Sequence, residues 1–398
     1  SSDLPHGVSA YWGDEAIWDG HTSIHNVMFD EQGKVWFTAR LRQAANPPFC
    51  RQGSTHPAAQ VFPQDSSVRQ LSRFDPVTKQ FDLIDTCFST HHLYFGFDAD
   101  DTLWTSAGSP VLGNGLIGWL NTRRFRETRD AAASQGWSPL VIDTNGNGRR
   151  DAYVEPGQPL DPAKDRRVVA SVYGVMPSPV DDTVWGQSMD RGYSRIDQPG
   201  YLVHFIPGSD PVHTGLTEIY QPPEGSFGPR GLDMGLDGLV WTALSSGHLA
   251  SFDRRKCKAP LAGPQATGGH CPEGWAFYRY PGPGFAGFEK NSAEASYYTW
   301  VDQHNTFGLG ENIPMSTANL NDGFVALKDG KMVMIRIPYP LGFYAKGFDG
   351  RIDDPAAGWK GRGLWSTNGD RAPWLMEGGK GSKPRAVHIQ LRPDPLAQ

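Results

Sequence analysis

The chain has 398 residues, a net charge of −6 and 38% hydrophobic residues, enough for a large core. A nucleic-acid partner is not expected because no basic stripe is present, and no apolar run approaches the roughly 20 residues of a membrane span. The 47 glycines and 32 prolines are typical of many turns between short strands, which favours an all-β fold.

A polar turn followed by a β-prone run with a tryptophan recurs along the chain. Its first copy spans residues 30–38, with Trp36 near the start of the second strand of a predicted hairpin. Further copies lie at residues 98–106, 181–186 and 236–242, and weaker echoes at 329–333 and 363–367. A repeated hairpin of this kind predicts a β-propeller. We therefore expect a single β-propeller domain over residues 1–398, with six to seven four-stranded blades and long loop insertions.

The N-terminal segment, residues 1–22, is a candidate closing strand. Pairing with the last blade would join the two termini in one sheet and protect an exposed edge. The chain starts with Ser-Ser-Asp rather than Met. We therefore expect a processed protein, with a signal peptide or upstream domains preceding this sequence.

The first two predicted blades carry long connections. In blade one, which begins near His25, outer strands are expected near residues 70–74 and 80–84, after a loop insertion over residues 42–67. Blade two is expected to hold its first strand near residues 91–95, its third near 116–120, a short helix over 125–134 and its fourth strand near 140–142.

The later blades become less regular toward the C-terminus. Blades three and four are expected to open near residues 171–174 and 229–233. Blade five is expected to have an inner strand at 296–301 and outer strands at 324–327 and 332–336. Blade six is expected to use residues 344–348, 364–366, 373–376 and 386–389.

The four cysteines have no Cys-x-x-Cys spacing, so neither a zinc ribbon nor a redox motif is indicated. We expect two disulfides, Cys50–Cys87 and Cys257–Cys271, which predict an oxidising compartment and thus a periplasmic or secreted protein. The alternative is four buried free thiols in a cytosolic protein.

Residues 143–155 have the pattern of a calcium loop. Gly148 stands at position 6, where such a loop turns sharply, but position 12 is Val154 instead of Glu. The oxygen-bearing side chains at positions 1, 3, 5 and 9 are Asp143, Asn145, Asn147 and Asp151. We expect a structural Ca²⁺ ion here; the alternative is an Asx-rich turn without a metal.

Residues about eleven places before each repeated tryptophan are expected to converge at the mouth of the central channel. Those places hold His25, Leu93 with His92 beside it, Gly174 and Arg230, with His91 and Tyr173 as neighbours. His304 lies just past the predicted inner strand of blade five. Histidine can act as a general base or metal ligand, and arginine can hold a carboxylate or stabilise developing negative charge. The alternative is that these side chains pair with main-chain groups.

The phrases at residues 33–38 and 229–242 resemble the blade repeat of the streptogramin lyase (virginiamycin B lyase) family. The chain also resembles the propeller region of larger uncharacterised bacterial periplasmic proteins. The resemblance implies a seven-bladed fold and lyase chemistry, with a His at an inner-strand start and a Glu and a second His just past the same blade's tryptophan. His25 matches the first position, but Ala39 and Leu41 occupy the other two. His92 is followed at the matching places by Ser106 and Gly108.

Three hypotheses follow from these patterns. The first is an extracytoplasmic lyase-type enzyme acting on a small or oligomeric polar substrate, with His25 or His92 moving a proton and Arg230 stabilising negative charge. The second is a periplasmic oxidoreductase in which His25, His92 and His304 hold copper, iron or another transition metal. The third is a non-catalytic binding or scaffold propeller.

Overall fold

The computed structural model describes residues 24–106, 115–188, 199–294, 296–338, 343–368 and 385–391. They belong to two compact units. The N-terminal unit holds the described residues of Ser23–Ser246 and Ala250–Ala276, and the C-terminal unit holds those of Gly247–Leu249 and Phe277–Gln398. The predicted closing strand at residues 1–22 lies outside the described residues, and the single domain stays a prediction. None of the helices in the described part of the chain has the length and hydrophobicity needed to span a lipid bilayer.

The strands form antiparallel sheets in which chain order is also spatial order, as in propeller blades. The first sheet consists of β1 (Ile24–Phe29), β2 (Val35–Ala39), β3 (Gln70–Asp75) and β4 (Gln80–Ile84). The second consists of β5 (Leu93–Phe95), β6 (Thr102–Thr105), β7 (Leu116–Asn121) and β8 (Gln135–Pro139). The third consists of β12 (Val172–Pro177), β13 (Val184–Ser188), β14 (Tyr201–Ile206) and β15 (Leu216–Tyr220).

Three further sheets of this type follow. The fourth consists of β16 (Pro229–Met234), β17 (Val240–Leu244), β18 (His248–Phe252) and β19 (Trp275–Arg279). The fifth consists of β20 (Thr299–Asp302), β21 (Ile313–Ala318), β22 (Gly323–Lys328) and β23 (Lys331–Arg336). The sixth has three described strands, β24 (Phe348–Ile352), β25 (Arg362–Asn368) and β26 (Arg385–Ile389). The predicted all-β propeller fold is thereby confirmed.

The remaining elements are short. A small sheet between the second and third blades contains β9 (Val141–Ile142), β10 (Tyr153–Val154) and β11 (Asp165–Arg167). The α-helices are α1 (Pro57–Val61), α2 (Thr122–Thr128), α3 (Ala131–Ser134) and α4 (Pro211–Thr214). The 3₁₀ turns are η1 (Pro48–Cys50), η3 (Arg254–Lys256), η4 (Pro272–Gly274) and η5 (Pro355–Gly361).

The repeated tryptophan stands in the second strand of its sheet. Its positions are Trp36 in β2, Trp104 in β6, Trp185 in β13, Trp241 in β17 and Trp365 in β25. The Trp36 Nε1 donates a 2.9 Å hydrogen bond to Asp30 Oδ2 in the preceding turn. Trp365 Nε1 does the same with Asp353 Oδ2, also at 2.9 Å. This bond links the acidic turn of the repeat to its tryptophan and fixes the hairpin.

Two predicted strand positions are wrong. The fourth strand of the second sheet is β8 rather than residues 140–142, whose Val141 and Ile142 form β9 of the small sheet. The sequence of β8 is Gln-Gly-Trp-Ser-Pro, and all five residues are buried, so packing overrides weak strand propensity. The echo at 329–333 is the turn between the third and fourth strands of the fifth sheet, not a tryptophan hairpin. The second strand of that sheet is β21. It contains Pro314, and because proline is rare inside strands, the sequence does not look like a strand.

Two other predictions need adjustment. The predicted helix over 125–134 is two helices, α2 and α3, separated by Arg129 at a φ of +58°. In the sixth sheet, the predicted strand 373–376 lies outside the described residues. The predicted strand 386–389 lies in β26, which pairs directly with β25.

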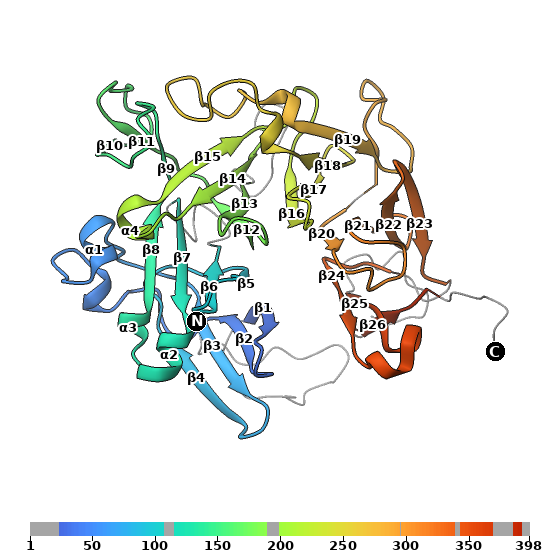
Figure 1. The fold of residues 1–398 in the computed structure, drawn as a ribbon, viewed down its shortest axis with the longest axis horizontal. Helices are drawn as coiled ribbons and strands as arrows, with labels where there is room; N and C mark the ends of the chain where they lie inside the picture. The colour runs from blue at the N-terminus through green and yellow to red at the C-terminus, as the bar shows by residue number, and fades with distance from the viewer. Residues whose placement is uncertain are drawn as a thin grey trace, which may run out of the picture. The chain divides into compact units, whose positions relative to one another are not determined.

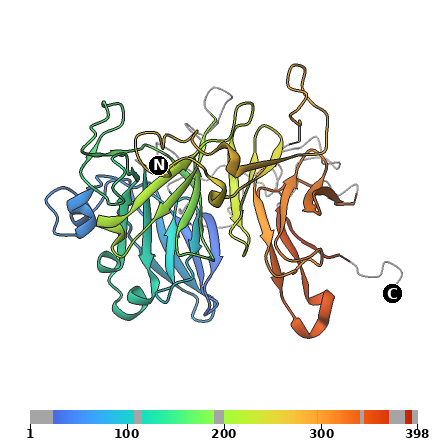
Figure 2. The same cartoon turned by 45° about the horizontal axis from the view of Figure 1, so that its top comes forward.

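Within the N-terminal unit, the first strands of successive sheets contact one another. β1 contacts β5, β5 contacts β12, and β12 contacts β16. Figure 1 shows these four strands on the inner side of the unit, with β4, β8 and β15 on its outer side. In Figure 2, the strands of the first two sheets, blue to teal, run side by side. Residues that begin the first strands are therefore neighbours in space.

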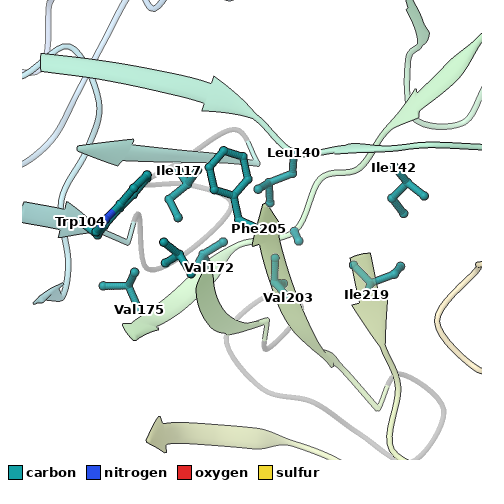
Figure 3. Packing of buried hydrophobic residues seen from close by; sticks show 11 residues of the cluster. Trp104, Ile117, Leu140, Ile142, Val172, Val175, Val203, Phe205 and Ile219 are labelled. Atoms are coloured by element: carbon teal, nitrogen blue, oxygen red, sulfur yellow. The ribbon is translucent and has the colours of Figure 1, made fainter. Parts of the chain in front are cut away.

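Hydrophobic side chains fill the space between the second and third sheets. Trp104 and Ile117 from one sheet pack with Val172, Val203 and other residues of the next (Figure 3). Leu140 and Ile142 belong to the same cluster and are 0% and 4% exposed, so they tie the small sheet to the two blades.

Both predicted disulfides, Cys50–Cys87 and Cys257–Cys271, are confirmed. They indicate an oxidising, extracytoplasmic compartment. Cys50–Cys87 fastens the insertion 42–67 to the first sheet, and the predicted loop also contains η1 and α1. Arg42 holds the insertion as well, through a 2.7 Å ion pair with Asp85 and bonds to several main-chain oxygens.

Candidate functional site

Three histidines from two neighbouring sheets form one group, here called the histidine cluster. His25 lies in β1, while His91 and His92 directly precede β5. One ring nitrogen from each histidine lies within 4.8 Å of the other two. The Nε2 atoms of His25 and His92 are 3.3 Å apart, and the rings of His25 and His91 stack with centroids 3.9 Å apart.

The histidines stand where strand pairing is irregular. The register between β1 and β2 shifts between Ile24 and Val27, next to His25. The main chains of His91 and His92 both pair with Ser106: His91 N donates to Ser106 O, and Ser106 N donates to His92 O. Two residues thus oppose one, as in a β-bulge, which re-aims side chains. This is why the adjacent residues His91 and His92 can both contact His25 instead of alternating between faces.

The same irregularity recurs in the next two sheets. Registers shift between Val172 and Gly174 in β12, and between Arg230 and Leu232 in β16. Tyr173 consequently lies against the cluster, with its ring centroid 4.7 Å from that of His91 and 5.1 Å from that of His92. The guanidinium carbon of Arg230 lies 5.9 Å from the Tyr173 ring centroid. The site thus extends from the cluster through an aromatic ring to a cation.

Polar side chains two residues after Trp36, Trp104 and Trp185 hold these bulges in place. Thr38 Oγ1 donates a 2.9 Å hydrogen bond to His91 O in the next sheet. Ser106 Oγ donates to Tyr173 O at 2.6 Å, again one sheet further on. The Gln187 side-chain oxygen accepts from Gly231 N at 2.9 Å and from Gly174 N at 3.3 Å. Each of the first three blades therefore positions the bulged first strand of the blade that follows it.

The cluster is anchored on one side and accessible on the other. His91 is only 8% exposed, whereas His25 is exposed and His92 is half-buried. Tyr173 and Arg230 are also half-buried. A small polar ligand can therefore approach from the His25 side, while the surrounding main chain fixes the imidazoles.

Two chemical arrangements fit the cluster geometry. A separation of 3.3 Å between two imidazole nitrogens allows an N–H···N hydrogen bond, which leaves a proton to be shared between the rings. It also equals the separation of about 3.3–3.4 Å between two nitrogens bound tetrahedrally at about 2.0–2.1 Å from one metal ion. The His91 ring is the third member of the group, and its Nδ1 lies 3.4 Å from the main-chain oxygen of Tyr173.

The other predicted site residues belong to other elements of the chain. His304 is exposed in the turn after β20, in the C-terminal unit. Leu93, one of the positions found by counting back, is 2% exposed and packs in the core. The predicted calcium ligands lie in the loop between β9 and β10: Asp143, Asn145, Asn147 and Asp151.

Counting residues brought His25, His92 and Arg230 together but gave less weight to His91 and Tyr173. The bulges explain the difference, because an extra residue in a strand changes which side chain faces a given side. A usable signal was the glycine that follows the bulged residue in Tyr173-Gly174 and Arg230-Gly231. Gly231 has a φ of +52°, and a Cβ on Gly174 would lie 2.9 Å from the Gln187 side chain.

The chain matches no protein-family model and no curated protein sequence. Solved structures that resemble it include virginiamycin B lyase from Staphylococcus aureus, at 11% identity and a TM-score of 0.46, covering 93% of this chain and 85% of that one. Another is the periplasmic gluconolactonase of Pseudomonas aeruginosa, at 13% identity and a TM-score of 0.44, covering 91% of this chain and 88% of that one. A luciferin-regenerating enzyme matches at 9% identity and a TM-score of 0.42, covering 92% and 93%.

The propeller fold of this chain is shown by its own sheets. These solved structures are similar to it at low identity, and the family resemblance expected from the blade repeat stays a prediction. The chemistry has to be argued from the residues of this chain.

Proposed function

We propose that this protein is a metal-dependent, lyase-type enzyme that acts outside the cytoplasm on a small or oligomeric polar substrate carrying a negative charge. The observation that carries the proposal is the convergence of three imidazole nitrogens, from His25, His91 and His92, within 4.8 Å. Imidazole suits zinc, copper, iron and nickel, and a site with three histidines leaves a coordination position for water or substrate.

A divalent ion in such a site would act as a Lewis acid, polarising a substrate oxygen. The residues of the chain supply the other functions. Arg230 is suited to bind a carboxylate through two parallel N–H···O hydrogen bonds. It could also stabilise the negative charge that develops during an elimination. Tyr173 lies between Arg230 and the histidines, and its ring supports the guanidinium through a cation–π contact.

The setting also supports this proposal. Two disulfides favour an oxidising compartment, where the chain would be periplasmic or secreted. The exposed edge of His25 gives a substrate access, and the bulges bring the three rings together. The rings stack on one another, so they would have to turn for all three nitrogens to face one ion.

Metal titration of chelator-treated protein tests this proposal. The wild type is expected to bind one Zn²⁺ or Cu²⁺ ion per chain, measured by calorimetry and by elemental analysis after dialysis. His25→Ala and His92→Ala should abolish this stoichiometric binding. His213→Ala is the matched control. His213 is an exposed histidine of α4 that pairs with Asp210, the residue before that helix. Wild-type protein without bound metal, or variants that bind like the wild type, would overturn the proposal.

A second candidate rests on the 3.3 Å contact between His25 and His92. If the pair forms an N–H···N bond without a metal, it can act as the proton-transfer group of a metal-free lyase. Activity that survives complete metal removal would favour this candidate. A copper- or iron-dependent oxidoreductase would instead lose the electron paramagnetic resonance signal of its bound Cu²⁺ or Fe³⁺ when substrate reduces the metal.

A further inference from the structure

The loop between β9 and β10 contains the predicted calcium ligands but has no acid at its twelfth position. In a calcium loop of this type that position normally supplies a bidentate carboxylate. Here it is Val154, which lies in β10 and cannot coordinate a cation through its side chain. A complete site therefore needs a carboxylate from another segment.

The small sheet brings such a carboxylate to the loop. β11 pairs with β9 so that Arg166 faces Ile142, which sets Asp165 across from Asp143, the first loop position. β10 pairs with β11 on its other side, with Tyr153 facing Asp165. Asp165 consequently lies between the beginning and the end of the loop. Ile142 is held in the core cluster shown in Figure 3, so this end of the loop is anchored.

The side chain of Asp165 is fully buried, and one of its two carboxylate oxygens has no hydrogen bond of normal geometry. Its exposed fraction is 0%. Its Oδ2 accepts a 2.7 Å hydrogen bond from the main-chain nitrogen of Asp151, so the carboxyl group lies directly against the loop. Its Oδ1 is buried without a hydrogen-bond partner of normal geometry. Burying an unpaired carboxylate oxygen is costly, and coordination of a cation removes that cost.

The charge of Arg150 interacts with that of Asp165, but no hydrogen bond between the two side chains is seen, and the hydrogen bonds of the nearby cations go to other groups. Arg150 donates to Ser138 Oγ and to Val212 O, each at 2.8 Å. Lys164 pairs with Asp161 at 3.1 Å. Burial raises the pKa of the Asp165 carboxyl, as do the charges of Asp143 and Asp151, while the main-chain amides of Asp151 and Thr144 act in the opposite direction.

The loop already has the shape that a cation requires. Asp143 accepts hydrogen bonds from the main-chain nitrogens of Gly146 at 2.6 Å and Gly148 at 2.7 Å. Both glycines have φ values near +77°, at +77° and +76°, which other residues adopt at a cost. The side-chain nitrogens of Asn145 and Asn147 both donate to Asp151 Oδ2, at 2.8 and 2.6 Å. The side chains at positions 3, 5 and 9 thus converge. Rotation of the two amides would present oxygens instead of nitrogens, at the loss of the hydrogen bonds that their oxygens now accept from the main-chain nitrogens of Asn147 and Arg149.

We infer that a Ca²⁺ ion binds between this loop and β11, with Asp165 replacing the missing twelfth-position acid. Its ligands are oxygens from Asp143, Asn145, Asn147, Asp151 and Asp165. Three carboxylates and two amides match the hard, oxygen-rich coordination that Ca²⁺ prefers over transition metals. By joining β9, β10 and β11, the ion stabilises the small sheet, which packs against the second and third blades through Ile142. This site is separate in its residues and ligand chemistry from the histidine cluster.

Calcium titration of the full chain, after removal of bound metal with a chelator, tests this inference. We expect one Ca²⁺ site by calorimetry, with a dissociation constant at or below the 10⁻⁴–10⁻³ M order of extracellular modules, and a higher melting temperature with Ca²⁺. Asp165→Asn should weaken binding at least about tenfold and remove most of the calcium-dependent rise in melting temperature. Asp161→Asn is the matched control, because Asp161 is an acid of the same segment that pairs with Lys164 instead of facing the loop.

A second variant guards against misfolding of Asp165→Asn. Asp151→Asn changes a loop ligand that is not fully buried, and it should lose Ca²⁺ affinity while keeping the circular dichroism spectrum of the wild type. Absence of calcium binding by the wild type would overturn the inference. So would Asp165→Asn protein that binds Ca²⁺ as tightly as the Asp161→Asn control, since a site confined to the loop would behave in that way.

Discussion

One hydroxyl group of Thr38 links two parts of the histidine cluster. Its oxygen accepts a 2.9 Å hydrogen bond from the main-chain nitrogen of Asn26, the neighbour of His25. It also donates a 2.9 Å hydrogen bond to the carbonyl oxygen of His91 in the next sheet. Thr38 is fully buried, so neither bond competes with bulk water. A residue that touches no ligand therefore sets the spacing between His25 and His91.

Thr38→Val should weaken zinc binding by about 10-fold or more while the chain stays folded. The change keeps the shape of the side chain but removes both hydrogen bonds, and supporting partners of metal ligands commonly have effects of this size. Thr38→Ser should restore most of the affinity. Thr105→Val is the control, because Thr105 is equally buried but bonds to Gly118 within its own sheet. Equal zinc affinity for the two valine variants would contradict a positioning role for Thr38.

Arg230→Gln should reduce the affinity of zinc-loaded protein for a small dicarboxylate such as malonate by about tenfold. A charged hydrogen bond to a carboxylate contributes about 1.5–3 kcal/mol, and glutamine cannot replace its charge. Zinc affinity itself should not change, because Arg230 contacts Tyr173 rather than the metal. Arg255→Gln is the control, since Arg255 is an exposed arginine that pairs with Asp253. Calorimetry measures the malonate affinity of each variant. Identical affinities for the two variants would show that Arg230 does not bind the carboxylate.

The third sheet holds a buried carboxylate whose charge stabilises the fold. Glu218 accepts hydrogen bonds from Arg254 at 2.5 and 2.6 Å, His204 at 2.8 Å and Tyr220 at 2.6 Å. Burial alone would raise the pKa of Glu218, but Arg254, His204 and Tyr220 outweigh it and lower the pKa to about 2. The folded pKa lies below the unfolded value of 4.5, so this stabilisation is present above pH 4.5 and is lost as the pH falls toward 2.

Glu218→Gln should therefore make the free energy of unfolding fall less steeply as the pH is lowered. The wild type is expected to lose about 3 kcal/mol between pH 5 and pH 2 that the variant does not lose. Urea unfolding at several pH values measures the difference between the two proteins, in which the effects of the other carboxylates cancel. Profiles that stay parallel down to pH 2 would show that the charge of Glu218 contributes nothing to stability.

The two disulfides should differ in their contribution. Cys50–Cys87 spans 37 residues of sequence and Cys257–Cys271 spans 14. On the chain-entropy model, these separations correspond to about 4 and about 3 kcal/mol of unfolding free energy. Replacing each pair by alanine and measuring urea unfolding should give the larger loss for the first, whose cysteines are also packed in the core. The reverse order would contradict this expectation, because both loop length and the burial of the cysteines favour the first pair.

Much of the fold could be predicted because the residues that define the blade repeat lie close together in the sequence. The acidic turn and the tryptophan belong to one hairpin, and the Asp30–Trp36 hydrogen bond shows why they recur together. Strands such as β8 and β21 were misplaced or missed because burial, not local propensity, determines them.

The site was harder to predict because it depends on contacts between blades. Register counting assumes a regular strand, so it found His25 and Arg230 but could not anticipate that His91 and His92 both point toward His25. Asp165 was missed for a similar reason. It is twenty-two residues beyond Asp143, and only the pairing of β11 with β9 brings it to the loop.

The most direct test of the histidine cluster is X-ray absorption spectroscopy of the zinc-loaded protein. The account predicts one zinc ion with three imidazole nitrogens at about 2.0–2.1 Å and a fourth ligand, the oxygen of a water molecule. The signal of three imidazoles should fall to two in His25→Ala protein reloaded with excess zinc. A wild-type spectrum with no imidazole ligands, or with only one, would contradict the proposed metal centre.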